Sequence, residues 1–129
     1  MAVKYWSQEW VTEVNNRIQS DEAVQNAVKG QSITVGNIIS GAPEGDIQGY
    51  FRIKDGTPEV GTGEPPENPE ATLKLDYDTA VAVAKGELQG QAAFMQGKLK
   101  IEGNMMKVMQ LQGFMQQMGK ATEDIEVEY

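Results

Sequence analysis

Apolar residues alternate with polar ones in some stretches of the chain and recur every three or four residues in others. Alternation is clearest in IQGYFRIK at residues 47–54, where odd-numbered residues point one way and even-numbered residues the other. Asp55-Gly56 then favours a hairpin turn, so an antiparallel partner is expected next. Strands are predicted at residues 31–39, 47–54, 57–63, 71–75 and 98–102. The third is expected to be a short edge strand because prolines and glycines flank Val60.

Helical spacing is bounded by residues that commonly cap helices. Ser7 is a typical N-cap, a second start is predicted at Ser20-Asp21-Glu22, and Asn104 is well placed to cap the last helix. Asp76 or Asp78 can cap the helix in between. Helical patterns cover residues 10–18, 24–28, 77–84, 91–96 and 105–118. Each strand offers one apolar face and each helix one apolar stripe, which favours an α/β (α+β) fold built as one domain over residues 1–129.

The stretch from residue 92 to 118 holds a short helix, a strand and a helix with five of the seven methionines. Methionine is flexible and fills irregular apolar space, so this stretch is expected to close an apolar cavity. Projected as one helix, residues 105–118 form a wide apolar arc with Gln112 inside it. A polar group there needs a hydrogen bond, either from nearby backbone or water or from the polar head of a ligand. Both interpretations of Gln112 stay open.

Composition excludes several classes of function. The chain has no cysteine and no histidine, so it lacks disulfides, thiolate sites and the commonest general base and metal ligand. Its net charge of -8 argues against nucleic-acid binding. Carboxylates such as Asp78, Glu87 and Glu102 fall on solvated positions, which does not favour acid-base catalysis. We therefore expect a protein that is not an enzyme and uses no metal or cofactor.

Charge is unevenly distributed. Residues 85–120 hold five lysines and two acids and the rest of the chain is strongly acidic. The lysines either form an ordinary solvated face or attract anionic lipid head groups beside the cavity mouth. No apolar run is long enough for a signal peptide or a membrane span, so a cytoplasmic location is expected. The acidic tail at residues 121–129 is either a short strand or a frayed end.

Residues 93–105, AFMQGKLKIEGNM, resemble the signature of the sterol carrier protein 2 (sterol-binding domain) family. The similarity extends backward through residues 71–75 and 77–88 and to the strand at 46–56 that ends in Lys-Asp-Gly. It is good from about residue 31 to 118. The resemblance implies a five-stranded, mainly antiparallel sheet with helices covering one face and an apolar tunnel between them. It also implies a ligand such as a sterol, fatty acid, fatty acyl-CoA or phospholipid.

The function expected from both arguments is noncatalytic lipid binding or lipid transfer, with transient membrane contact. The alternative is an accessory module that presents a lipid or isoprenoid substrate to a partner enzyme. The residues predicted to line the ligand space are Phe51, Ile53, Leu75, Val81, Phe94, Met95, Leu99, Ile101, Met105, Met106, Met109, Gln112, Met115 and Met118.

Overall fold

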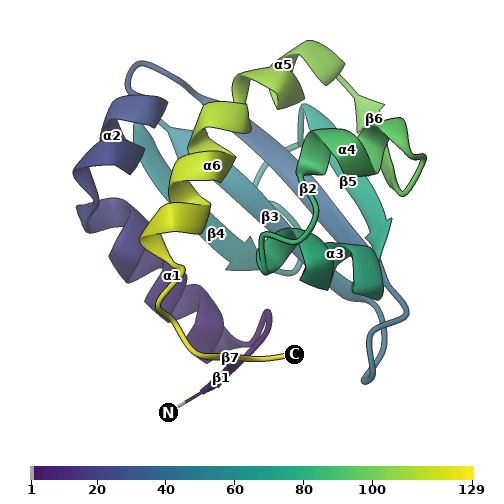
Figure 1. The fold of residues 1–129 in the computed structure, drawn as a ribbon. Helices are drawn as coiled ribbons and strands as arrows, with labels where there is room; N and C mark the ends of the chain where they lie inside the picture. The colour runs from purple at the N-terminus through teal and green to yellow at the C-terminus, as the bar shows by residue number, and fades with distance from the viewer. Residues whose placement is uncertain (1) are drawn as a thin grey trace.

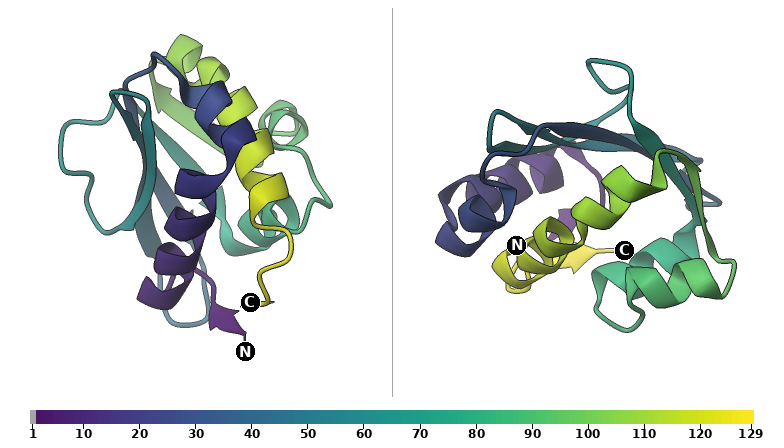
Figure 2. Two further views of the ribbon diagram at one scale, coloured as in Figure 1. Left: turned by 90° about the vertical axis from the view of Figure 1, so that its left-hand side faces the viewer. Right: turned by 90° about the horizontal axis from the view of Figure 1, so that it is seen from above.

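A five-stranded sheet with all the longer helices on one side forms the body of the protein (Figures 1 and 2). The computed structural model describes residues 2–129. The strands of the main sheet are β2 (Ile33–Ser40), β3 (Ile47–Lys54), β4 (Thr57–Thr62), β5 (Ala71–Asp76) and β6 (Leu99–Gly103). The helices are α1 (Gln8–Ser20), α2 (Glu22–Val28), α3 (Tyr77–Ala84), α4 (Gly90–Met95), α5 (Met105–Gln110) and α6 (Gln112–Ala121).

The strands lie in the order β4-β3-β2-β5-β6, and every neighbouring pair is antiparallel except β2 and β5. The predicted fold class is thereby confirmed. The parallel pair follows from the connection at residues 63–70, which carries the chain from edge strand β4 across the sheet to β5. In Figure 2 this loop lies on the side of the sheet opposite the helices. We call the helix side the inner face and the loop side the outer face.

Asn15 and Gln19 of α1 cover the exposed edge of β4. The Asn15 side chain accepts a hydrogen bond from the Val60 backbone N–H at 2.8 Å and donates one to its carbonyl at 2.9 Å. Gln19 donates to the carbonyl of Pro58 at 3.1 Å. An unpaired strand edge is a site for unwanted pairing with other chains. Here helix side chains satisfy that edge.

The main core lies between β2, β3 and β4 on one side and α1, α2 and α6 on the other. Phe114 of α6 is fully buried there with Ile18, Val24, Val35 and other apolar residues. On the outer face, Arg52 pairs with Glu59 and with Glu67 of the proline-rich loop. That pair of contacts ties the loop to the sheet.

The two chain ends meet in a small second sheet. β1 (Val3–Lys4) pairs in parallel with β7 (Val127–Glu128), so the tail forms a short strand rather than a frayed end. Tyr5 packs against Tyr129, Tyr77 and Trp10 with ring centroids 5.0 to 6.3 Å apart. Burial in this aromatic cluster raises the pKa of Tyr5 to about 12.

The helix predicted over residues 105–118 is wrong as a single element. α5 ends at Gln110, the chain bends at Leu111, and α6 begins at Gln112. Leu111 is buried at this bend. Gly113 follows in the first turn of α6, where glycine weakens helix continuity. The bend directs α5 away from the core and toward β5 and α4 (Figure 1).

Asp76 should stabilise the protein as the N-cap of α3. Its carboxylate accepts a hydrogen bond from the Thr79 backbone N–H at 2.7 Å. Hydrogen bonds from Thr79 hold the pKa of Asp76 below its ordinary value of 3.8. We expect Asp76→Ala to lower the free energy of unfolding by about 1 kcal/mol at neutral pH.

Because the folded pKa is depressed, this contribution is present above pH 3.8 and is lost as pH falls through the folded pKa. Urea unfolding at pH 7 and at pH 3 measures the difference between the parent and the variant. The neighbouring exposed residue supplies a control, Asp78→Ala, which removes an acid from the same first turn but no cap. An equal effect of the two variants, or a gap that widens in acid, would contradict the assignment.

Candidate functional site

The inner face of the sheet carries mainly apolar side chains. Its side chains come from alternate positions, with Val35 opposite Phe51, Leu73 opposite Ile101 and Leu75 opposite Leu99. This is the pattern that the sequence predicts for half-buried strands. A lipid chain could therefore lie against any part of this face that the helices leave uncovered.

Helices cover the two ends of this face unequally. Over β3 and β4, Phe51, Ile53 and Val60 are fully or almost fully buried beneath α1, α2 and α6. Over β5 and β6 Ala71 is buried, whereas the larger inner residues are only half-buried. We call this second group the apolar strip, and it consists of Leu73, Leu75, Leu99 and Ile101.

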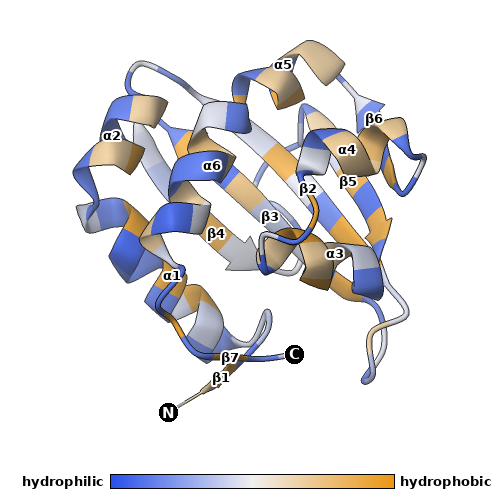
Figure 3. Cartoon of the chain, in the orientation of Figure 1, coloured by the Kyte–Doolittle hydropathy of each residue, from blue (hydrophilic) through white to orange (hydrophobic). Residues whose placement is uncertain are grey.

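Two separate groups of helices produce this difference. α6 packs against α1 and α2, whereas α3 lies on β5 and β2 and α4 on β6. Seen from above, α1, α2 and α6 stand apart from α3 and α4 (Figure 2, right). Hydrophobic positions of the strands are visible between them in Figure 3. The apolar strip is thus flanked by helices without being sealed by them.

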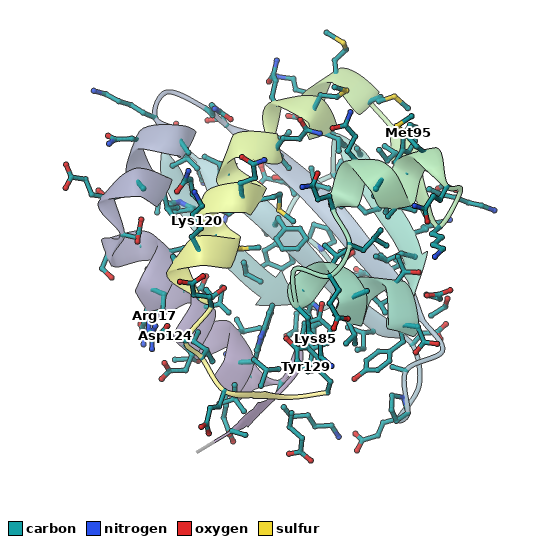
Figure 4. All side chains as sticks on the ribbon, viewed as in Figure 1. Arg17, Lys85, Met95, Lys120, Asp124 and Tyr129 are labelled. Carbon is teal, nitrogen blue, oxygen red and sulfur yellow. The ribbon has the colours of Figure 1, made fainter. Side chains whose placement is uncertain are left out.

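Large apolar residues are exposed beside the strip, on α4 and α5. They range from Phe94, 38% exposed, to Met106 and Met95, 72% and 77% exposed. We call this group the methionine rim, and it consists of Phe94, Met95, Met105, Met106 and Met109. Met95 lies near the junction of α4, α5 and β6 (Figure 4). Exposed apolar patches of this kind commonly mark binding surfaces.

The structure divides the predicted lining residues among four settings. Phe51 and Ile53 belong to the closed core, and Gln112 is exposed. The half-buried members are Leu75, Val81, Leu99, Ile101, Met115 and Met118. The remaining members form the methionine rim. The half-buried residues of β5, β6 and α3 lie on the same side of the fold as the rim, whereas Met115 and Met118 of α6 pack against the closed core. The role of all these residues as a ligand lining stays a prediction.

Gln112 does not lie on the apolar arc of one long helix. It is the first residue of α6, its side chain is exposed, and no hydrogen bond joins that side chain to another described residue. Water can satisfy an exposed amide, so the position of Gln112 gives no support to a ligand contact.

The polar residue that the sequence argument missed is Asn37. It is 4% exposed and lies on the inner face between Val35 and Ile39. A signal was present, because Ile33, Val35, Asn37 and Ile39 share one face of a predicted strand and only one of them is polar. An apolar alternation interrupted by a single amide marks a buried polar group.

Two hollows elsewhere on the surface do not coincide with the apolar strip. One, of about 390 Å³, lies between the loop at residues 63–70 and the outer face. The other, of about 530 Å³, borders the end of α2 and the β3–β4 turn. The tunnel between sheet and helices therefore stays a prediction. Among residues 2–129 there is no group of acidic side chains that could hold a metal ion, and no helix is long and apolar enough to cross a membrane.

Known proteins resemble this chain in sequence and in fold. The chain is 32% identical to human hydroxysteroid dehydrogenase-like protein 2 over 102 residues, which cover 79% of this chain and 24% of that protein. It is 28% identical to a fatty acid-binding protein of Yarrowia lipolytica over 103 residues, 79% of each chain. The chain thus spans about a quarter of the length of the dehydrogenase-like relatives.

A possible sterol carrier protein from Thermus thermophilus has the same fold, with a TM-score of 0.79 at 14% identity over 98% of this chain and 93% of that one. The model of the SCP-2 sterol transfer family matches residues 12–116, which include the whole main sheet, α2 to α5 and most of α1. From this match, the chain belongs to the SCP-2 sterol transfer family.

Proposed function

We propose that this protein is a noncatalytic carrier that holds one lipid against the apolar strip. The observation that carries the proposal is the half-buried inner face of β5 and β6, bordered by exposed methionines. Methionine side chains adapt to ligands of different shape at little cost. Membership of a sterol transfer family and the similarity to a fatty acid-binding protein support a lipid ligand. A sterol, fatty acid, fatty acyl-CoA or phospholipid would suit an apolar site of this kind.

Burial of an alkyl chain supplies enough free energy for such binding. Each methylene contributes about 0.8 kcal/mol, so a chain of about sixteen carbons gains roughly 12 kcal/mol before ordering costs. A micromolar dissociation constant needs about 8 kcal/mol. Helices α4 and α5 would have to move outward to admit the chain. α5 has no buried residue and α4 has one, Ala93, so such a movement would disrupt little packing.

The lipid site is tested by a polar substitution on each face of the edge strand β6. Ile101→Gln places an amide in the apolar strip, whereas Lys100→Gln places the same side chain on the outer face. We expect delipidated parent protein to bind cis-parinaric acid with micromolar affinity and Ile101→Gln to bind it about tenfold more weakly. Lys100→Gln should bind like the parent. Parent protein that ignores the probe, and carries no lipid detectable by native mass spectrometry, would contradict the proposal.

The second candidate is an accessory module that presents a lipid or isoprenoid substrate to an enzyme. It is favoured by one observation, namely that relatives carry the matching region as about a quarter of a longer, dehydrogenase-like protein. Both candidates require the same lipid site. They differ in transfer, since a carrier accelerates lipid exchange between vesicles on its own and a presenting module binds lipid without doing so.

A carrier also has to meet the membrane that supplies its ligand, and the methionine rim suits that contact. Lys98 and Lys107 lie beside the rim, and no ion pair within 4 Å joins either of them to another described residue, although the charge of Lys98 helps to lower the pKa of Asp76. Each lysine near an anionic surface contributes about 1 kcal/mol, while the exposed apolar side chains can enter the head-group region. We propose a transient contact of this corner with anionic bilayers in the cytoplasm.

Two acidic substitutions in the rim test this contact. We expect Met95→Glu/Met106→Glu to reduce sedimentation with phosphatidylserine-containing vesicles, and the rate of lipid transfer from them, by about tenfold. Binding of monomeric cis-parinaric acid in solution should change little. Ala23→Glu/Asn26→Glu makes the same change in charge on the exposed side of α2 and serves as control. Equal losses in the two double variants would show that net charge, and not the rim, governs the contact.

A further inference from the structure

Asn37 places an amide in the middle of the inner face. Its cross-strand partners are Gly49 of β3 and Leu73 of β5, in an unbroken register that also pairs Val35 with Phe51. The Trp6 ring covers Gly49 so closely that a Cβ there would lie 2.5 Å from a ring carbon. The side chain of Asn37 is therefore enclosed by Trp6 on one side, and on the other it borders Leu73 of the apolar strip.

No hydrogen bond joins the Asn37 side chain to any other described residue, although it is only 4% exposed. The hollow on the outer face also borders Asn37. Successive residues of a strand face opposite sides, so Gly36 and Ile38 face the outer side and the side chain of Asn37 faces the inner side. Asn37 therefore borders the hollow through its main chain. Asn15 shows the usual arrangement, since its amide both donates to and accepts from the backbone of Val60. The fully buried side-chain polar atoms that lack a hydrogen-bond partner are Trp6 Nε1 and Arg52 Nε, so the Asn37 amide still touches accessible space on the inner face. In the described part of the chain the Asn37 amide thus has no protein partner and is open to one that a ligand supplies.

The chemistry of that partner is limited by its surroundings. The buried core residues packed against the inner face are hydrophobic, and one of them, Trp6, holds a buried indole N–H without a partner. The other buried polar side chains are Thr34 on the outer face and Thr79 at the start of α3. None of the described residues supplies a cationic group there to balance a carboxylate or phosphate, and an unpaired charge would be expelled from such a site. A neutral hydroxyl or carbonyl can pair with the amide without that cost.

We propose that Asn37 is a polar anchor inside the lipid site and that it selects lipids whose inward end carries a neutral hydroxyl or carbonyl. This inference rests on the proposed lipid-carrier function. The alkyl part of such a lipid lies along the apolar strip, and the neutral end reaches the sheet centre to hydrogen-bond with the amide. A fatty acid binds the other way round, with its charged carboxylate outside, beside Lys98 and Lys107.

Three fluorescent probes separate these cases: parinaryl alcohol with a neutral hydroxyl, cis-parinaric acid with a carboxylate, and diphenylhexatriene with no polar group. We expect Asn37→Leu to weaken binding of the alcohol about fivefold to tenfold, the effect of one lost hydrogen bond at a buried amide. Binding of the acid and of diphenylhexatriene should stay within about twofold of the parent. Energy transfer from Trp6 and Trp10 to the bound polyene gives the readout.

Thr34→Val is the matched control, because Thr34 is an equally buried polar residue on the same strand but on the outer face. It should leave all three affinities unchanged. Asn37→Val, smaller and β-branched, provides a second variant. Both Asn37 variants should unfold at the same temperature as the parent or higher, because the amide they remove has no protein partner.

Equal weakening of all three probes by the Asn37 variants, or no selective loss of the alcohol, would overturn the anchor while leaving the carrier function intact. Failure of both variants to fold would also overturn it, since that would reveal a partner for the amide within the protein. If parent protein binds none of the probes, the carrier function itself fails.

Discussion

Packing of α6 against α1, α2 and the sheet decides which part of the inner face is closed. Phe114 of α6 is fully buried in that contact, together with residues from both N-terminal helices. The bend at Leu111 then turns α5 away, so the packing of α6 does not continue across β5 and β6, which α3, α4 and α5 contact instead. A single continuous helix in the place of α5 and α6 would change how much of β5 and β6 is covered. The half-covered strip and the exposed methionines of α5 both follow from this one bend.

The outer face is organised by a different constraint. The chain must travel from edge strand β4 to β5, and the loop at residues 63–70 crosses the sheet to do so. Arg52 pairs with Glu67 of this loop, which keeps it on the sheet. The hollow beneath it is open and bordered by polar and small residues. The two faces are thereby specialised, one for packing and apolar ligands and the other for the chain crossing.

Sequence patterns predicted the strands and most helices because alternation, capping residues and the Asp55-Gly56 turn are local signals. Ser7, Asp21, Asp76 and Asn104 all cap helices as expected. The bend at Leu111 was not predicted because it depends on which apolar residues pack against the sheet and α2. A helical projection of residues 105–118 contains no information about those contacts. Asn37 was missed for another reason, since its significance lies in the absence of any partner across the sheet. The pairing of the two termini likewise depends on contacts between residues more than a hundred positions apart.

The central claim is that lipid lies on the inner face over β5 and β6. Hydrogen-deuterium exchange measured with and without a saturating long-chain lipid tests it directly, because the rival surface is the hollow under the loop at residues 63–70. The account predicts slower exchange in α4, α5 and the β6 edge, with little change in β3, β4 and the outer loop. Protection confined to the outer loop, or equal protection throughout the chain, would contradict it.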